Sequence, residues 1–214
     1  MALTLKTFFF PFYPNMPKLF SNQHFPEVRR IVQKTSSHCG PAVLEMLLSF
    51  VGKDIDQEEF VDAVQITDKL PTHGMFISEM GEAVRVLAPD MQFWFKHNSS
   101  LSELRQLVMN YKYPAGVEWQ GVFYEEEDED NGHYSVVTYI DTTNNIIMLA
   151  DPYKRFAGSD RIFHILEFED RWWDENEVRD PETGSTKLER DYHTMLVITP
   201  KEDAWPEELE MTRG

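Results

Sequence analysis

The stretch QKTSSHCGPA, residues 33–42, places the only cysteine of the chain between a histidine and a Gly-Pro pair. The residues that follow, GPAVLEMLLSFVGKDI, carry apolar side chains at helical spacing, and Gly52 supplies a stop signal. Pro41 suits the first turn of a helix, where its missing N–H would have had no partner. The sequence therefore predicts that Cys39 lies at the N-terminus of a helix.

A cysteine in this position has two interpretations. Buried free cysteines are usually inert and serve as small apolar residues. A thiol becomes a nucleophile only as the thiolate, whose pKa falls below about 8.5 at a helix N-terminus or beside a histidine. The free N–H groups of the first helical turn favour negative charge, and they can also stabilise the oxyanion formed when a thiolate attacks a carbonyl. Cys39 alone leaves both interpretations open.

Three further residues would complete a reactive site around Cys39. Gly132-His133 opens the predicted strand HYSVVTYID, and Asp151-Pro152 ends the predicted strand NIIMLADP. We expect the imidazole of His133 to face the helix start as general base, with Asp151 orienting the ring through its other nitrogen. Gln33, six residues before the cysteine, is the candidate for a second oxyanion donor.

The order of the predicted elements gives the fold class. Amphipathic helices are predicted first, at 56–64, 76–88 and 101–111, with 71–74 as a loop. Strands then follow at 114–119, 133–141, 145–152 and 192–200, and 159–174 is interpreted as a strand edge leading into a helical turn. The strands 133–141 and 145–152, separated by TTNN, form a predicted antiparallel hairpin. Helices before strands indicate an α+β protein.

The motifs resemble those of the papain-like cysteine peptidases that process bacteriocin leaders, the double-glycine peptidases of family thirty-nine, and especially their stand-alone relatives. The matching residues are Gln33, Cys-Gly-Pro-Ala at 39–42, Gly-His-Tyr at 132–134 and Asp-Pro-Tyr at 151–153. The resemblance covers about residues 25–200. It implies a papain-like fold in which an N-terminal helical lobe, with the cysteine at a helix start, packs on a C-terminal antiparallel β-sheet.

The same resemblance implies a role for each residue of the site. Cys39 would be the nucleophile, His133 the general base and then acid, Asp151 the orienting acid, and Gln33 the oxyanion donor. No membrane-transport segment or ATPase follows in these 214 residues, so we do not expect a role in leader removal during export.

We expect the chain to divide into three parts. Residues 1–24 form an aromatic segment expected to pack on the domain. Residues 25–200, which the resemblance covers, are expected to form one papain-like domain, with a helical part at about 25–112 and a sheet part at about 113–200. Residues 201–214 are interpreted as an acidic C-terminal tail.

Charge and composition exclude several partners. The 37 acidic and 20 basic residues give a net charge of -17, which repels phosphate backbones and anionic lipid surfaces. No apolar run approaches the roughly 20 residues that span a bilayer, and Pro11 interrupts the N-terminal aromatic run too early for a signal peptide. A single cysteine forms no internal disulfide. We expect a soluble cytoplasmic protein whose partner is a peptide or amide-containing substrate; the sequence leaves its oligomeric state open.

Other polar and aromatic residues are weaker candidates. His38 beside Cys39 does not supply the three or four ligands that zinc needs, so no metal or cofactor is predicted. Trp119 and Trp172 are candidate substrate contacts, although such residues usually pack in a core or cleft wall. His73, His97, His164 and His193 are interpreted as structural or surface residues.

An acidic run, EEEDEDNGH at 125–133, carries six acids just before His133. Its usual meaning is a solvated loop. The alternative is a cleft rim that favours basic or amine-bearing substrates and raises the pKa of His133.

The sequence thus favours a thiol hydrolase that cleaves a peptide, isopeptide or other amide bond through an acyl-thioester. Two alternatives remain: a catalytically silent binding domain of the same fold, and an acyl-transfer or peptide-conjugating thiol enzyme of the phytochelatin-synthase type.

Overall fold

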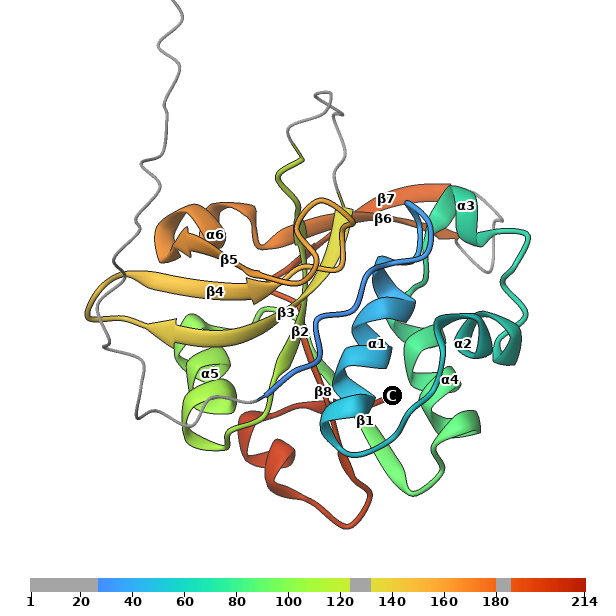
Figure 1. Ribbon diagram of the computed structural model, residues 1–214, viewed down its shortest axis with the longest axis horizontal. Coiled ribbons are helices and arrows are strands. Elements are labelled where there is room, and N and C mark those ends of the chain that lie inside the picture. Colours follow the sequence, from blue (N-terminus) through green and yellow to red (C-terminus); the bar gives the residue numbers. More distant parts are fainter. Residues whose placement is uncertain (1–26, 124–131, 180–185) are drawn as a thin grey trace, which may run out of the picture.

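The computed structural model describes residues 27–123, 132–179 and 186–214 (Figure 1). The expectations for the aromatic segment 1–24 and for the acidic run 125–130 lie outside these residues. The described chain combines helices with antiparallel strands, which confirms the α+β class.

The long helices form where apolar spacing predicted them. They are α1 (Cys39–Phe50), α2 (Gln57–Ala63), α4 (Ile77–Leu87) and α5 (Leu101–Arg105), which continues as the π-helical turn η2 (Gln106–Asn110). Asp56 and Ser100 cap α2 and α5 through reciprocal capping boxes. The predicted loop at 71–74 is wrong, because α3 (Leu70–His73) forms there with proline in its first turn.

Seven strands form one sheet in the order β5-β4-β3-β2-β8-β1-β9, and every pairing is antiparallel. The strands are β1 (Met91–Lys96), β2 (Ala115–Gln120), β3 (Gly132–Asp141), β4 (Ile146–Ala150), β5 (Asp160–His164), β8 (Met195–Pro200) and β9 (Thr212–Arg213). A separate hairpin pairs β6 (Trp173–Arg179) with β7 (Thr186–Tyr192). Two short helices, α6 (Ile165–Arg171) and the 3-10 turn η3 (Trp205–Leu209), complete the chain.

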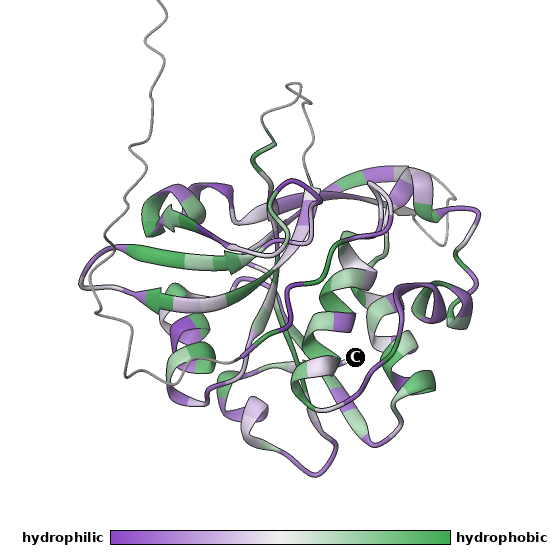
Figure 2. Cartoon of the chain, viewed as in Figure 1, coloured by the Kyte–Doolittle hydropathy of each residue, from purple (hydrophilic) through white to green (hydrophobic). Residues whose placement is uncertain are grey.

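The sheet separates two hydrophobic clusters. On β8, Leu196 and Ile198 join the cluster formed by α1, α2 and α4, while Met195 and Val197 join the cluster on the other face, formed with α5, η2 and α6. This alternation follows from the two-residue period of a strand. Figure 2 shows hydrophobic residues concentrated in α1 and in the strands of the large sheet.

Two boundaries differ from the sequence-based division. The part expected to be helical, about 25–112, contains the strand β1. This strand pairs with β8, which lies near the end of the sequence. The segment 201–214 is more than an acidic tail: Leu209 and Met211 are buried, and β9 pairs with β1 at Phe95↔Thr212. Scattered apolar residues among acids therefore anchor this segment on the sheet. Within the described ranges, no helix has both the length and the hydropathy needed to cross a bilayer.

Candidate active site

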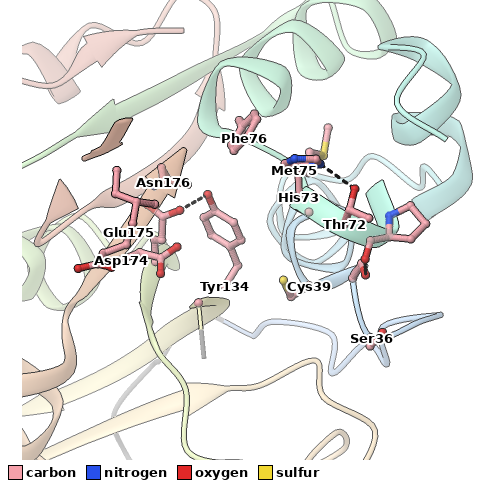
Figure 3. Close-up of a pocket in the computed structure, with 16 residues that line it drawn as sticks. Ser36, Cys39, Thr72, His73, Met75, Phe76, Tyr134, Asp174, Glu175 and Asn176 are labelled. Atoms are coloured by element: carbon pink, nitrogen blue, oxygen red, sulfur yellow. Dashed lines mark hydrogen bonds between the residues drawn. The ribbon is translucent and has the colours of Figure 1, made fainter. Parts of the chain in front are cut away.

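Cys39 is the first residue of α1 and opens onto a cavity of about 410 Å³. The residue is 9% exposed, so its side chain is largely buried yet reaches the cavity wall (Figure 3). Gly40 allows a close approach of the chain that follows α3, because a Cβ at this position would lie 3.1 Å from the Cβ of Met75. The cysteine therefore sits at the base of a cleft, beside the turn that leads into α4.

The imidazole of His133 connects the cysteine to an acid. His133 is the second residue of β3 and is buried opposite Trp119 of β2. Its Nε2 atom lies 2.8 Å from Oδ1 of Asp151, and interaction with the thiol of Cys39 contributes to raising the pKa of the same ring. Since Nε2 faces the carboxylate, Nδ1 is the nitrogen left for the sulfur. The structure thus brings together three of the residues singled out in the sequence.

The carboxylate of Asp151 follows the end of β4 and is fully buried. Its Oδ1 also accepts the backbone N–H of Tyr153 at 2.9 Å, and its Oδ2 accepts Nη1 of Arg161 at 2.7 Å. Burial, the largest influence, raises the pKa of Asp151, but the charge and hydrogen bond of His133, with Arg161 and Tyr153, bring it below its usual value. Asp151 is therefore held as a carboxylate with a fixed orientation.

Arg161 is a positioning residue that the sequence analysis missed. It lies on β5, with its guanidinium 3.7 Å from the centre of the Phe156 ring and 4.8 Å from that of Phe163. Its Nη2 atom donates to the carbonyl of Val122 at 2.9 Å, which leaves Nη1 directed at Asp151. Burial alternates along β5, so that Arg161 and Phe163 turn inward and Ile162 faces outward, but the residues of this short strand do not show in advance which face is buried.

The electrostatics favour a thiolate paired with an imidazolium. Burial is the largest influence on the pKa of Cys39 and raises it, but the hydrogen bond and charge of His133, helped by the backbone N–H groups of Tyr134 and Gly40, lower it below its usual value. Burial lowers the pKa of His133, yet Asp151 and then Cys39 raise it to about 9. Each member of the pair therefore stabilises the charged form of the other.

Comparison with known proteins assigns the family. A protein-family model described as the Peptidase_C39 like family matches residues 25–178. The chain belongs to the Peptidase_C39 like family. No curated protein matches the chain.

Two solved structures show the same fold as this Peptidase_C39 like chain. The peptidase domain of Streptococcus ComA, a bi-functional ABC transporter involved in quorum sensing, is 16% identical, with a TM-score of 0.55 over 80% of this chain and 97% of that one. A double glycine motif protease from an AMS/PCAT transporter, in complex with its leader peptide, is 17% identical, with a TM-score of 0.53 over 84% and 96%. The fold is therefore that of a papain-like, cysteine peptidase-like domain, as expected.

Gln33 lies in the loop that precedes Cys39, and it connects this loop to the residues that follow β4. Its backbone N–H donates to the carbonyl of Pro152 at 2.8 Å. Its side-chain Nε2 donates to the carbonyls of Thr35 at 2.7 Å and Ser36 at 2.9 Å, and its buried Oε1 has no hydrogen-bond partner among the described residues. In this conformation the amide nitrogen shapes the loop ahead of the nucleophile.

The two tryptophans suggested as substrate contacts lie in the core. Trp119 and Trp172 are both fully buried, with indole N–H groups donated to Ser135 Oγ at 3.1 Å and to the carbonyl of Thr194 at 2.9 Å. Both indoles pack with Phe168, and neither is among the residues that line the cavity beside Cys39.

The cleft of this Peptidase_C39 like domain has two walls (Figure 3). One wall carries Thr72, His73 and Met75, and the other carries Asp174 and Asn176 of β6, on either side of Cys39. His73, interpreted from sequence as structural or surface, thus lines the cavity. In the part of the chain that the structure describes, no three His, Cys, Asp or Glu side chains gather as a metal site would require.

Proposed function

We propose that the chain is a thiol hydrolase that cleaves a peptide, isopeptide or other amide bond through an acyl-thioester. The observation that supports this most strongly is the geometry of one imidazole. His133 meets Asp151 through Nε2 at 2.8 Å, His133 and Cys39 shift each other's pKa toward the charged forms, and Cys39 lines the cleft. An oriented acid–base group beside an accessible thiol is the arrangement that nucleophilic catalysis needs.

The proposed reaction has two halves. The Cys39 thiolate attacks the carbonyl carbon of the substrate, and the tetrahedral oxyanion is stabilised by the backbone N–H groups at the start of α1. The imidazolium of His133 gives its proton to the leaving amine as the C–N bond breaks, which leaves an acyl-thioester. The neutral imidazole then takes a proton from water as that water attacks the thioester, and the thiolate and imidazolium are restored.

Gln33 is proposed as the second oxyanion donor. Its Nε2 now donates to the carbonyls of Thr35 and Ser36. The role requires one of these N–H bonds to turn toward the cleft when substrate binds, as catalytic hydrogen bonds often tighten only in the complex.

A peptide is the proposed substrate. The fold neighbours are peptidase domains, and one of them was solved with a leader peptide bound. The cavity of about 410 Å³ around Cys39 falls within the usual range for small ligand sites, which is wide enough for a few residues of an extended chain.

The test is cleavage of a degenerate peptide library, read by mass spectrometry of the new termini. The wild-type protein is expected to cut a restricted set of bonds, while Cys39→Ser, which keeps the shape of the side chain, is expected to cut none with unchanged thermal unfolding. No cleavage by the wild type, or equal cleavage by Cys39→Ser, would overturn the proposal. New amide products on addition of a free amine would point to acyl transfer instead.

A further inference from the structure

One wall of the cleft beside Cys39 is acidic. The cavity is lined by Glu118, Asp174 and Glu175, and among the described lining residues there is no lysine or arginine. Glu175 is paired with Arg190, on the exposed side of the β6–β7 hairpin, whereas Glu118 and Asp174 are buried. The two buried acids therefore dominate the charge of this wall.

The Glu118 carboxyl is incompletely satisfied. Its Oε1 accepts the hydroxyl of Tyr134, while Oε2 is buried with no hydrogen-bond partner among the described residues. The side chain is 2% exposed and lines the cavity. A buried carboxylate oxygen without a donor is costly unless something supplies a hydrogen bond and a counter-charge. The cavity is the side from which a ligand can supply both.

The second acid, Asp174, lies at the cavity wall in the space left by Gly132. A Cβ at position 132 would lie 2.6 Å from Oδ1 of Asp174, so any side chain larger than that of Gly132 would displace this carboxylate from its place over β3. The same oxygen accepts Nε2 of Gln120 at 2.7 Å. The glycine that precedes His133 thus allows the Asp174 carboxylate to approach β3, the strand that carries His133.

The two acids line the same cavity as the reactive sulfur. Tyr134 lines this cavity too, and its hydroxyl donates to Oε1 of Glu118. Negative charge in the cavity where the reaction takes place disfavours both a thiolate and an oxyanion. An acidic wall next to the nucleophile therefore works against the reaction unless the substrate itself brings a positive charge.

We propose that this pocket binds the cationic side chain of the peptide substrate, a lysine ammonium or an arginine guanidinium, close to the bond that Cys39 attacks. The apolar residues of the lining, Met75, Phe76 and Leu188, suit the aliphatic stem of such a side chain, while Glu118 and Asp174 receive its charged end. This inference rests on the proposed function for its substrate, and it adds which residue that substrate carries.

The pKa of Glu118 decides the pH at which the pocket carries its full charge. Burial is the largest influence on its pKa and, with the charge of Asp191, raises it to about 7, although the hydrogen bond from Tyr134 opposes the rise. A bound cation would lower this pKa again. Binding is therefore best measured at about pH 8, where the carboxyl is mostly ionised.

The first arm of the test needs no turnover. The single cysteine is modified by methanethiosulfonates that carry an ammonium, a methyl or a sulfonate group, and each rate is divided by that of the methyl reagent. The wild type is expected to prefer the ammonium reagent, and Glu118→Gln and Asp174→Asn each to reduce this preference. Glu82→Gln, which removes an exposed acid of α4 that pairs with Arg85, controls for net charge and is expected to leave the reagent preference unchanged.

The second arm uses peptides that the wild type cleaves, with lysine or arginine replaced by the neutral analogues norleucine or citrulline. We expect kcat/KM to favour the cationic peptide by at least about 10-fold, and Glu118→Gln to remove most of this ratio. Asp174→Asn serves as the second variant if Glu118→Gln does not fold, as judged by circular dichroism.

The outcomes separate the two proposals. Peptide cleavage without a cationic preference, in the wild type and both variants, overturns the cation pocket and leaves the hydrolase standing. A reagent preference that depends on Glu118 or Asp174, without cleavage of any peptide, supports the pocket and overturns the hydrolase. Equal reagent preferences in the wild type, the pocket variants and Glu82→Gln overturn the pocket whatever the peptides show.

Discussion

Asp151→Asn tests the electrostatic core of the site. The substitution keeps the shape of the side chain but removes the charge that contributes most to raising the pKa of His133. It also leaves the buried guanidinium of Arg161 without its carboxylate partner. Two separate effects follow, one on the thiolate–imidazolium pair and one on the stability of the fold.

The size of the first effect follows from the pKa of His133. A rise from the ordinary 6.5 to about 9 corresponds to about 3 kcal/mol in favour of the imidazolium, shared between Asp151 and Cys39. If Asp151 supplies most of it, its loss weakens the ion pair by about 2 kcal/mol, or about 30-fold in the ion-pair equilibrium. The His133 pKa falls from about 9, and the Cys39 pKa rises because its counter-charge is weaker. The pH range in which the Cys39 thiolate and the His133 imidazolium exist together therefore becomes narrower. Its lower limit rises with the Cys39 pKa, and its upper limit falls with the His133 pKa.

The assay is the rate of alkylation of Cys39 by iodoacetamide as a function of pH, read by intact mass, since the chain has one cysteine. The midpoint for the wild type should lie below the ordinary value of about 8.5, and the midpoint for Asp151→Asn should move up toward it. The double variant Asp151→Asn/Arg161→Gln removes the stranded cation, so it should recover stability while keeping the shifted midpoint. Identical profiles for the wild type and Asp151→Asn would refute the reasoning.

Three further outcomes are expected. Arg161→Met should lower the free energy of unfolding in urea by about 1.5–3 kcal/mol, because the buried carboxylate of Asp151 loses one charged hydrogen-bond donor and keeps His133 and the Tyr153 N–H, whereas Arg29→Met at an exposed pair should change it by less than about 1 kcal/mol; similar losses would contradict this. Gly132→Ala should displace the Asp174 carboxylate and reduce the preference for the ammonium reagent. An unchanged preference would contradict the inference that Gly132 makes room for this carboxylate in the pocket. His133→Ala should lose more peptide cleavage than Asp151→Asn in initial-rate assays, because the acid–base group itself is removed; the reverse order would contradict the assigned roles.

The sequence predicted the parts of the fold that depend on local signals. The apolar spacing after Cys39 and the proline in its first turn placed α1 correctly, and the β-branched runs around TTNN placed the hairpin of β3 and β4. It missed the hairpin of β6 and β7, because strands rich in charged residues carry no clear two-residue hydrophobic period.

The site was predictable only in part for a related reason. Motif residues such as Cys39 and His133 were recognisable by type and order, and the fold brings them together. Arg161 and Glu118 act through contacts between strands, to Asp151 and Tyr134, that depend on sheet register. An arginine or glutamate inside a short strand segment gives no sign by itself that it will turn inward, so these two residues needed the structure.

The ionisation state of Cys39 in the native protein is the most direct test of the thiolate–imidazolium pair. Ultraviolet thiolate absorbance is measured against pH, with Cys39→Ser subtracted as the blank, so that the signal comes from the single cysteine. Thiolate absorbance that is already present well below about pH 8.5, and that is lost from the neutral range in His133→Ala, is expected. Absorbance that first rises at or above that pH, or that is the same in His133→Ala, would contradict an activated nucleophile at the start of α1.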